Sequence, residues 1–150
     1  MIAFDTNILV YAEALDDPFQ RHIKSRSLLG KATLSDAVIP LQVFAELSNV
    51  CNRKNILKPL DLATRIAEYE SFFQTPANDM RDILLASTIA EQFKMQYFDA
   101  LIIAVAARAG ATILLSEDMH DGLEIGGLKI INPFAAANET LLADYFANAV

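Results

Sequence analysis

Residues 1–10 read MIAFDTNILV, an apolar run that ends at Asp5, followed by Thr6, Asn7 and a second apolar run. A short apolar run bounded by polar residues is typical of a buried strand, and we expect a strand over residues 2–5 and a helix over about 7–14. In open parallel α/β sheets, ligands bind at the carboxyl ends of strands, so Asp5 is a candidate site residue. Asp is also a preferred helix N-cap, and Asp5 could simply cap the helix that follows.

The rest of the chain continues this alternation of strands and helices. A segment at 74–79 indicates a further strand only weakly, because it contains Pro76 and polar neighbours. Strands that alternate with helices over short connections indicate an α/β fold with a parallel sheet and helices on both faces. We expect helices over about 19–31, from Pro40 to Asn52, from Pro59 onward, and over about 82–94 and 98–109, with strands at 37–39, 112–115 and 128–131.

The composition favours one folded domain spanning residues 1–150. A hydrophobic content of 53% and a mean hydropathy of +0.28 exclude disorder. The longest purely apolar stretch, 100–107, is far shorter than the roughly 18 to 20 residues that span a bilayer, so we expect no membrane association. The sequence shows no basic segment ahead of an apolar one at its start, and the single Cys51 has no disulfide partner, which together predict a cytoplasmic protein. Cys51 lies on an apolar helical stripe and is expected to be a core residue.

The charge is unevenly distributed. The net charge of −7 and pI near 4.7 argue against a protein that holds nucleic acid by bulk electrostatics. Residues 21–58, however, carry seven lysines and arginines against two acidic residues, a local balance of +5. This segment could form a basic rim beside an acidic pocket, or it could be the solvated faces of two helices.

Two acidic residues stand in apolar helical contexts. Glu46 shares a helical face with Val43 and Val50, a face that should turn toward the core. Burying an unpaired carboxylate there would cost several kcal/mol, so a basic partner or a cation must compensate it. Asp99 opens a helix that is apolar almost all round, the profile of a buried element. It could be a first-turn residue, a metal ligand, or both at once.

A further acid, Asp118, follows the apolar strand that ends at Leu115, at what we take to be a strand-end position equivalent to that of Asp5. If the two strands are neighbours, the carboxylates would repel each other unless a cation lies between them. Glu117 is expected to point away, and Asp121 to be a turn residue. His120 is the one candidate nitrogen ligand near this segment, although a single His in a polar loop is usually exposed.

Four carboxylates without a cysteine pair or a close histidine pair predict a hard oxygen-ligand site. Mg²⁺ or Mn²⁺ suits such a site better than zinc. Carboxylate sites of this kind use divalent ions to activate water and to neutralise charge on a phosphate that undergoes in-line displacement. The chemistry indicated is hydrolysis of phosphodiester bonds.

These residues together resemble the PIN domain, and in size and motif spacing they resemble the stand-alone VapC-like toxins of type II toxin–antitoxin pairs. The resemblance rests on Asp5-Thr6-Asn7, on Glu46 in a helix opened by Pro40, on residues 98–102 (FDALI) and on residues 114–119 (LLSEDM). It covers essentially the whole chain. It implies a PIN-like three-layer α/β/α fold with a central parallel sheet and an acidic pocket that binds Mg²⁺ or Mn²⁺. It also implies endonucleolytic cleavage of RNA such as tRNA, rRNA or mRNA that leaves a 3′-hydroxyl, and inhibition by a cognate antitoxin protein.

The resemblance assigns roles to particular residues. By it, the catalytic and metal-binding acidic tetrad is Asp5, Glu46, Asp99 and Asp118, and the supporting polar residues are Thr6, Asn7 and Ser116. The sequence departs from the family pattern at 74–79, where a strand is poorly indicated.

The resemblance and the high apolar content both lead us to expect a homodimer. The alternative to an enzyme is a catalytically inactive PIN-like binding module that acts through protein or RNA interaction, against which the four intact acids argue. A haloacid-dehalogenase-like phosphatase would have a second Asp at position 7, which is Asn7 here, and a response-regulator receiver would have an acid pair near the first strand.

Overall fold

The computed structural model describes residues 1–148 as a five-stranded sheet between two groups of helices. The strands are β1 (Ile2–Phe4), β2 (Ala37–Val38), β3 (Ile113–Leu115), β4 (Glu124–Ile125) and β5 (Leu128–Ile131), in the order β2-β1-β3-β5-β4. The helices are α1 (Thr6–Glu13), α2 (Arg21–Ala32), α3 (Leu41–Lys54), α4 (Pro59–Phe72), α5 (Met80–Phe93), α6 (Tyr97–Arg108) and α7 (Glu139–Asn148), with a short 3₁₀ turn at Ala136–Asn138.

The sheet is parallel except at one edge. β1 pairs in parallel with β2 and β3, and β3 pairs in parallel with β5. β4 is antiparallel to β5 and was not expected from the sequence. The turn between these strands is formed by Gly126 and Gly127, with φ of 59° and 84°. Such positive φ values at both central residues make the two-residue turn that suits a hairpin, so the Gly-Gly pair was the signal for β4.

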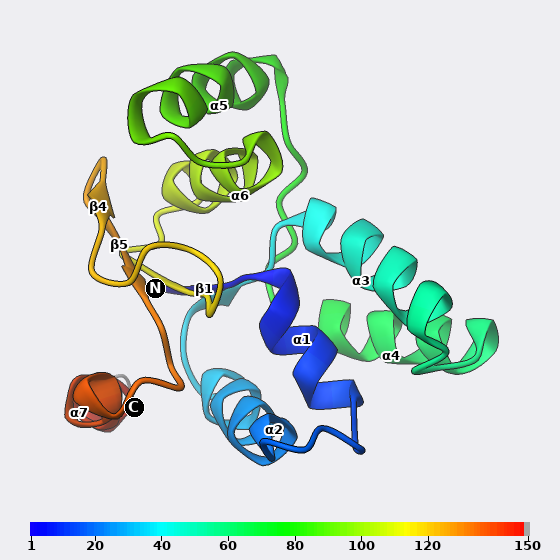
Figure 1. Cartoon of the computed structure of the whole chain (residues 1–150). Helices are drawn as coiled ribbons and strands as arrows, with labels where there is room; N and C mark the ends of the chain where they lie inside the picture. The colour runs from blue at the N-terminus through cyan, green and yellow to red at the C-terminus, as the bar shows by residue number, and fades with distance from the viewer. Residues whose placement is uncertain (149–150) are drawn as a thin grey trace.

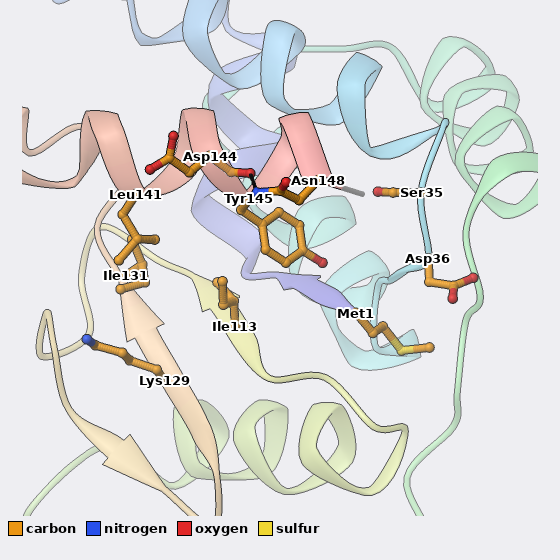
Figure 2. Close-up of a pocket in the computed structure, with 10 residues that line it drawn as sticks. All are labelled: Met1, Ser35, Asp36, Ile113, Lys129, Ile131, Leu141, Asp144, Tyr145 and Asn148. Carbon is orange, nitrogen blue, oxygen red and sulfur yellow. Dashed lines mark hydrogen bonds between the residues drawn. The ribbon is translucent and has the colours of Figure 1, made fainter. Parts of the chain in front are cut away.

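The helices cover both faces of the sheet, as expected. α5 and α6 lie over one face, and α2 and α7 lie over the other (Figures 1 and 2). Residues 100–106 of α6 are all buried, which confirms the prediction that this apolar helix lies inside the protein. α5 shields the side of α6 that faces away from the sheet (Figure 1). No element was expected beyond 131, yet Leu142 and Phe146 are buried on α7, at the spacing of one helical face.

The doubtful segment at 74–79 forms one isolated parallel bridge, between Val38 and Gln74. The amide of Ile39 donates to the carbonyl of Gln74 at 2.9 Å, and the amide of Leu41 donates to that of Pro76 at 3.0 Å. The segment therefore lines the edge of β2 without becoming a strand, as the proline suggested.

The core is continuous across the sheet and reaches Cys51, which is fully buried as expected. Within residues 1–148, no helix is long and apolar enough to cross a membrane.

An ion pair between buried Asp82 and exposed Arg108 ties α5 to α6. The carboxylate of Asp82 accepts hydrogen bonds from Arg108 Nε at 2.9 Å and Nη2 at 2.8 Å, and it also accepts from the amide of Asp79 in a capping box. The Arg108 guanidinium lowers the pKa of Asp82. The Asp82 side chain is 3% exposed, so its loss would leave a guanidinium and an amide without their acceptor.

We predict that Asp82→Ala lowers the free energy of unfolding by about 2 kcal/mol, because charge-assisted hydrogen bonds of a buried group are lost. Urea denaturation at neutral pH measures this. Arg81→Ala is the matched control, since Arg81 is 91% exposed and lies 3.8 Å from Asp79, and it should change stability by less than about 0.5 kcal/mol. Equal effects of the two substitutions would contradict the assignment.

Candidate active site

The carboxyl ends of β1 and β3 meet at Asp5 and Ser116. Phe4 pairs with Leu115, and the amide of Asp5 donates to the carbonyl of Leu115 at 3.0 Å. The next residue on each strand is therefore Asp5 on β1 and Ser116 on β3. The expectation that Asp118 holds the position equivalent to Asp5 is wrong: Ser116 holds it, and Asp118 lies two residues beyond in an exposed turn.

The Asp5 carboxylate is buried and surrounded by donors. It accepts from the amide of Thr6 at 2.6 Å, from Ser116 Oγ at 2.7 Å and from Asn7 Nδ2 at 3.0 Å. Asp5 thus caps α1, as one interpretation of the sequence proposed, and it also faces the strand end. Ser116 Oγ in turn accepts from the amide of Met119 at 3.2 Å, which fixes its rotamer. Thr6, Asn7 and Ser116 therefore all touch the acidic residues, as the resemblance implied.

Glu46 comes to the same place from α3. Its Oε2 accepts from Thr6 Oγ1 at 2.8 Å, and its Oε1 accepts from Gln42 Nε2 at 2.5 Å. Gln42 Nε2 also donates to the carbonyl of Phe98 at 3.2 Å, at the beginning of α6. Gln42 therefore links the helix that carries Glu46 to the helix that carries Asp99. Sequence reasoning missed Gln42, although its position four residues before Glu46 places both on one helical face.

Asp99 and Asp118 complete the cluster from α6 and from the turn after β3. Asp99 is half-buried in the first turn of α6, and within residues 1–148 neither acid forms a side-chain hydrogen bond. The same described part of the chain contains no ion pair to Asp5, Glu46, Asp99 or Asp118. The sequence led us to expect a basic partner or a cation for Glu46, and no lysine or arginine within residues 1–148 pairs with it.

The pKa values of two of these acids are raised. Burial raises the pKa of Asp5 from 3.8 to about 7; hydrogen bonds from Ser116 and Thr6 oppose the rise, and repulsion from Asp99 and Glu46 adds to it. Burial also raises the pKa of Asp99, with further contributions from Glu46 and Asp118. Repulsion therefore links Asp5 to Asp99 and Glu46, and links Asp99 to Glu46 and Asp118, the pattern found where a protein gathers charge for function.

The acids are gathered loosely. Across residues 1–148, no three His, Cys, Asp or Glu side chains stand close enough together to hold one metal ion. The sequence predicted one oxygen-ligand metal site formed by these carboxylates, and the structure does not bring three of them together, for local reasons. Thr6 and Gln42 hold Glu46, Ser116 and Asn7 hold Asp5, and like charges keep the rest apart.

Neighbouring residues of the same turn have structural contacts. Glu117 accepts from Arg21 and from the Tyr11 hydroxyl, so it points away from the cluster as expected. Asp121 accepts from the amide of Asn132 at 2.8 Å and from Asn138 at 2.9 Å, which confirms it as a turn residue. His120 is exposed.

The basic segment 21–58 is divided among several contacts. Arg21 pairs with Asp17 and Glu117, and Arg26 Nε donates to the carbonyl of Ala12 at 2.8 Å. Arg53 and Lys54 are exposed at the end of α3. The segment therefore does not form a single basic rim, although Arg21 lies next to the turn that carries Asp118.

A hollow with a volume of about 570 Å³ lies away from the four acids, between α7 and the sheet (Figure 2). Met1, Asp36 and Ile113 line it at the amino ends of β1, β2 and β3. None of the four clustered acids lines it. This hollow is therefore not the candidate active site formed by the four acids.

The chain has an open, mostly parallel α/β sheet in which the buried acid Asp5 follows β1 and three less buried acids lie nearby. The family model of the PIN domain matches residues 2–120, so this chain belongs to the PIN domain family. Among curated proteins, none matches the sequence significantly.

Two solved structures share the fold. A toxin–antitoxin complex from Klebsiella pneumoniae contains a chain that is 22% identical, with a TM-score of 0.63, and the match covers 89% of this chain and 98% of that one. VapC20 of Mycobacterium tuberculosis, described as a sarcin–ricin-loop-cleaving toxin, is 16% identical with a TM-score of 0.63, over 76% of this chain and 87% of its own.

The raised pKa of Asp5 fixes the direction of a pH effect. Between about pH 4 and pH 7 the folded chain holds this proton more tightly than the unfolded chain, so without a bound ion its contribution to stability falls as pH rises through that range. The full change of pKa corresponds to a cost on the order of 4 kcal/mol above pH 7. A cation in the cluster would offset that cost.

We predict that Mg²⁺ or Mn²⁺ raises the melting temperature of metal-free protein at about pH 8, and raises it less at about pH 5.5, where protons compete for Asp5. An ion at 100 times its Kd adds about 2.7 kcal/mol to the folded state. Asp5→Asn is the control: it should remove much of the fall in metal-free stability between pH 4 and pH 7 and reduce the response to the ion. Identical melting curves with and without ions at pH 8 would argue against a metal site.

Proposed function

We propose that this protein is a metal-dependent endoribonuclease, a VapC-like toxin that hydrolyses RNA phosphodiester bonds at Asp5, Glu46, Asp99 and Asp118. The observation that carries the proposal is electrostatic. Burial raises the pKa of Asp5, and repulsion from Asp99 and Glu46 adds to the rise; burial also raises the pKa of Asp99, and Glu46 and Asp118 add to it. No lysine or arginine pairs with any of these four acids within residues 1–148. Stability alone does not favour such an arrangement, so a function that uses the charge is the better account.

The four acids are the residues that would hold Mg²⁺ or Mn²⁺, and they would have to move closer together to share one ion, because no three of them are grouped tightly enough within residues 1–148. Carboxylate oxygens are the ligands these ions prefer, and the described cluster contains no sulfur ligand. The ion, when bound, neutralises charge on the phosphate and lowers the pKa of water.

The chain's own contribution is to fix the acids in place. Ser116, Asn7 and the Thr6 amide hold the Asp5 carboxylate, and the Thr6 hydroxyl and Gln42 hold Glu46. In the proposed reaction a water oxygen forms a bond to phosphorus while the bond from phosphorus to the 3′-oxygen breaks. The 3′-oxygen takes a proton, and the products are a 3′-hydroxyl and a 5′-phosphate.

The family and the neighbouring structures support a substrate class and a partner. The toxin–antitoxin complex and the RNA-cleaving toxin of the same fold support RNA as substrate (tRNA, rRNA or mRNA) and a cognate antitoxin as partner. With RNA as substrate, we place the protein in the cytoplasm. A reading frame beside the gene that encodes a small DNA-binding protein with an amphipathic tail would support the toxin assignment.

We also propose a homodimer. The outer face of α5 exposes Met80 and Leu84, at 69% and 64%, and Leu85 beside them at 49%. Met80 and Leu84 are four residues apart and share a helical face, so they form an apolar surface of the kind that protein contacts cover.

We predict that Asp99→Asn reduces Mn²⁺-dependent cleavage of total RNA by on the order of 100-fold or more while RNA binding is largely retained, because the lost charge acts in the transition state. Asp144→Asn removes an equal charge from exposed α7 and is the matched control, which should cut as wild type does. Wild-type protein that cuts no RNA in Mg²⁺ or Mn²⁺ would favour the inactive binding module instead.

We predict that Leu84→Asp converts the dimer to a monomer, because a charge would be buried in the apolar contact. Light scattering at micromolar concentration measures the mass. Leu60→Asp is the control: Leu60 is 83% exposed on α4, outside the α5 surface, and its substitution should leave the mass unchanged. A monomeric wild type would refute the dimer.

A further inference from the structure

A second pocket adjoins the acidic cluster. It has a volume of about 450 Å³ and is lined by Phe19, Gln20, Arg21, Lys24, Glu117 and Phe134. Glu117 directly precedes Asp118, and the amide of Glu117 donates to Asn7 Oδ1 at 3.4 Å. The pocket is therefore adjacent to the turn that carries Asp118.

Phe19 is an aromatic ring held out to solvent. It is 76% exposed and lies in the connection between α1 and α2, where a polar residue would avoid exposing an apolar ring to water. The Arg21 guanidinium carbon lies 5.1 Å from the centre of the Phe19 ring and 3.9 Å from that of Tyr11. One face of Phe19 is thus supported by a cation, while much of the ring stays accessible.

Several contacts hold this support in place. Arg21 Nη2 lies 2.6 Å from Asp17 Oδ1, and Arg21 Nη1 lies 3.0 Å from Glu117 Oε1. Tyr11 donates its hydroxyl to Glu117 and packs edge-on against Phe134, with ring centres 5.5 Å apart. These contacts order the pocket before any ligand arrives, which lowers the entropic cost of binding.

Two polar groups beside the ring remain free to meet a ligand. Arg21 is occupied by Asp17 and Glu117, but Lys24 forms no ion pair within the described residues 1–148. Gln20 is exposed at the rim. An accessible aromatic face, a free ammonium and an exposed amide are the combination that binds an unstacked base with its phosphate.

We propose that this pocket is a subsite for an unpaired nucleobase of the RNA, which stacks on Phe19 while Lys24 contacts the adjoining phosphate. The subsite rests on the proposed function, because it places a nucleotide that flanks the bond to be cut at the acidic cluster. It would select RNA with an unstacked base near the cleavage position, since a base inside a duplex cannot reach the ring.

The test measures binding without cleavage. Asp99→Asn protein serves as the parent, and the probe is a short fluorescein-labelled single-stranded RNA of mixed sequence, beside an abasic strand of equal length. Adding Phe19→Ala should raise the Kd for the RNA by roughly 10-fold, as expected for one stacked base, and should leave the Kd for the abasic strand unchanged. Phe19→Tyr should restore binding.

Two further variants sharpen the result. Phe72→Ala removes a ring that is 64% exposed on α4, outside the pocket, and should leave the RNA Kd unchanged. Lys24→Ala should reduce the salt dependence of binding by about one phosphate contact.

With Asp99 intact, Phe19→Ala should raise KM with kcat nearly unchanged.

The outcomes separate the subsite from the nuclease. Equal Kd values for the parent and Phe19→Ala, or an equal loss on the abasic strand, would overturn the subsite. An altered oligomeric state with unchanged RNA binding would overturn it as well and assign Phe19 to a protein contact. If wild type cuts no RNA but Phe19→Ala still weakens base-dependent binding, the subsite stands and the nuclease assignment fails.

Discussion

The burial of one carboxylate, that of Asp5, constrains the rest of the site. The carboxylate lies where β1 meets β3, and it is tolerated there because Ser116, Asn7 and the Thr6 amide all donate to it. Each donor comes from a residue whose place is fixed by the sheet or by the first turn of α1. The same arrangement leaves the pKa of Asp5 near 7, so its negative charge becomes costly as the pH approaches neutrality.

Around this carboxylate, the helices supply two further acids and the contacts that hold them. α3 brings Glu46 to the Thr6 hydroxyl, and Gln42 on the same helix reaches the beginning of α6, where Asp99 stands. α6 can approach this closely because it is buried between the sheet and α5, and the Asp82–Arg108 pair fastens those two helices together. Packing far from the acids thus determines how closely they approach one another.

The surface beside the cluster provides contacts that a chain of net charge −7 needs if it is to hold a polyanion. The +5 segment does not act as one patch, because Arg21 is paired and the remaining basic residues are dispersed. A preformed aromatic pocket next to Asp118 offers binding that depends on stacking more than on net charge. In this proposed arrangement the aromatic pocket binds the RNA and the acids carry out the chemistry.

The sequence by itself predicted most of the strand and helix order and the buried character of α6, because hydrophobic periodicity is a local signal. It also proposed the four acids, because an isolated acid in an apolar run is a local signal as well. It missed α7, the β4 hairpin that Gly126 and Gly127 signalled, and the role of Gln42. Only the tertiary structure decided the register of β1 and β3, which places Ser116 rather than Asp118 opposite Asp5. The tertiary structure also decided which basic residues form ion pairs; Arg21 is one of them. The physical reason is that register and pairing depend on contacts between residues about a hundred positions apart, which no local pattern encodes.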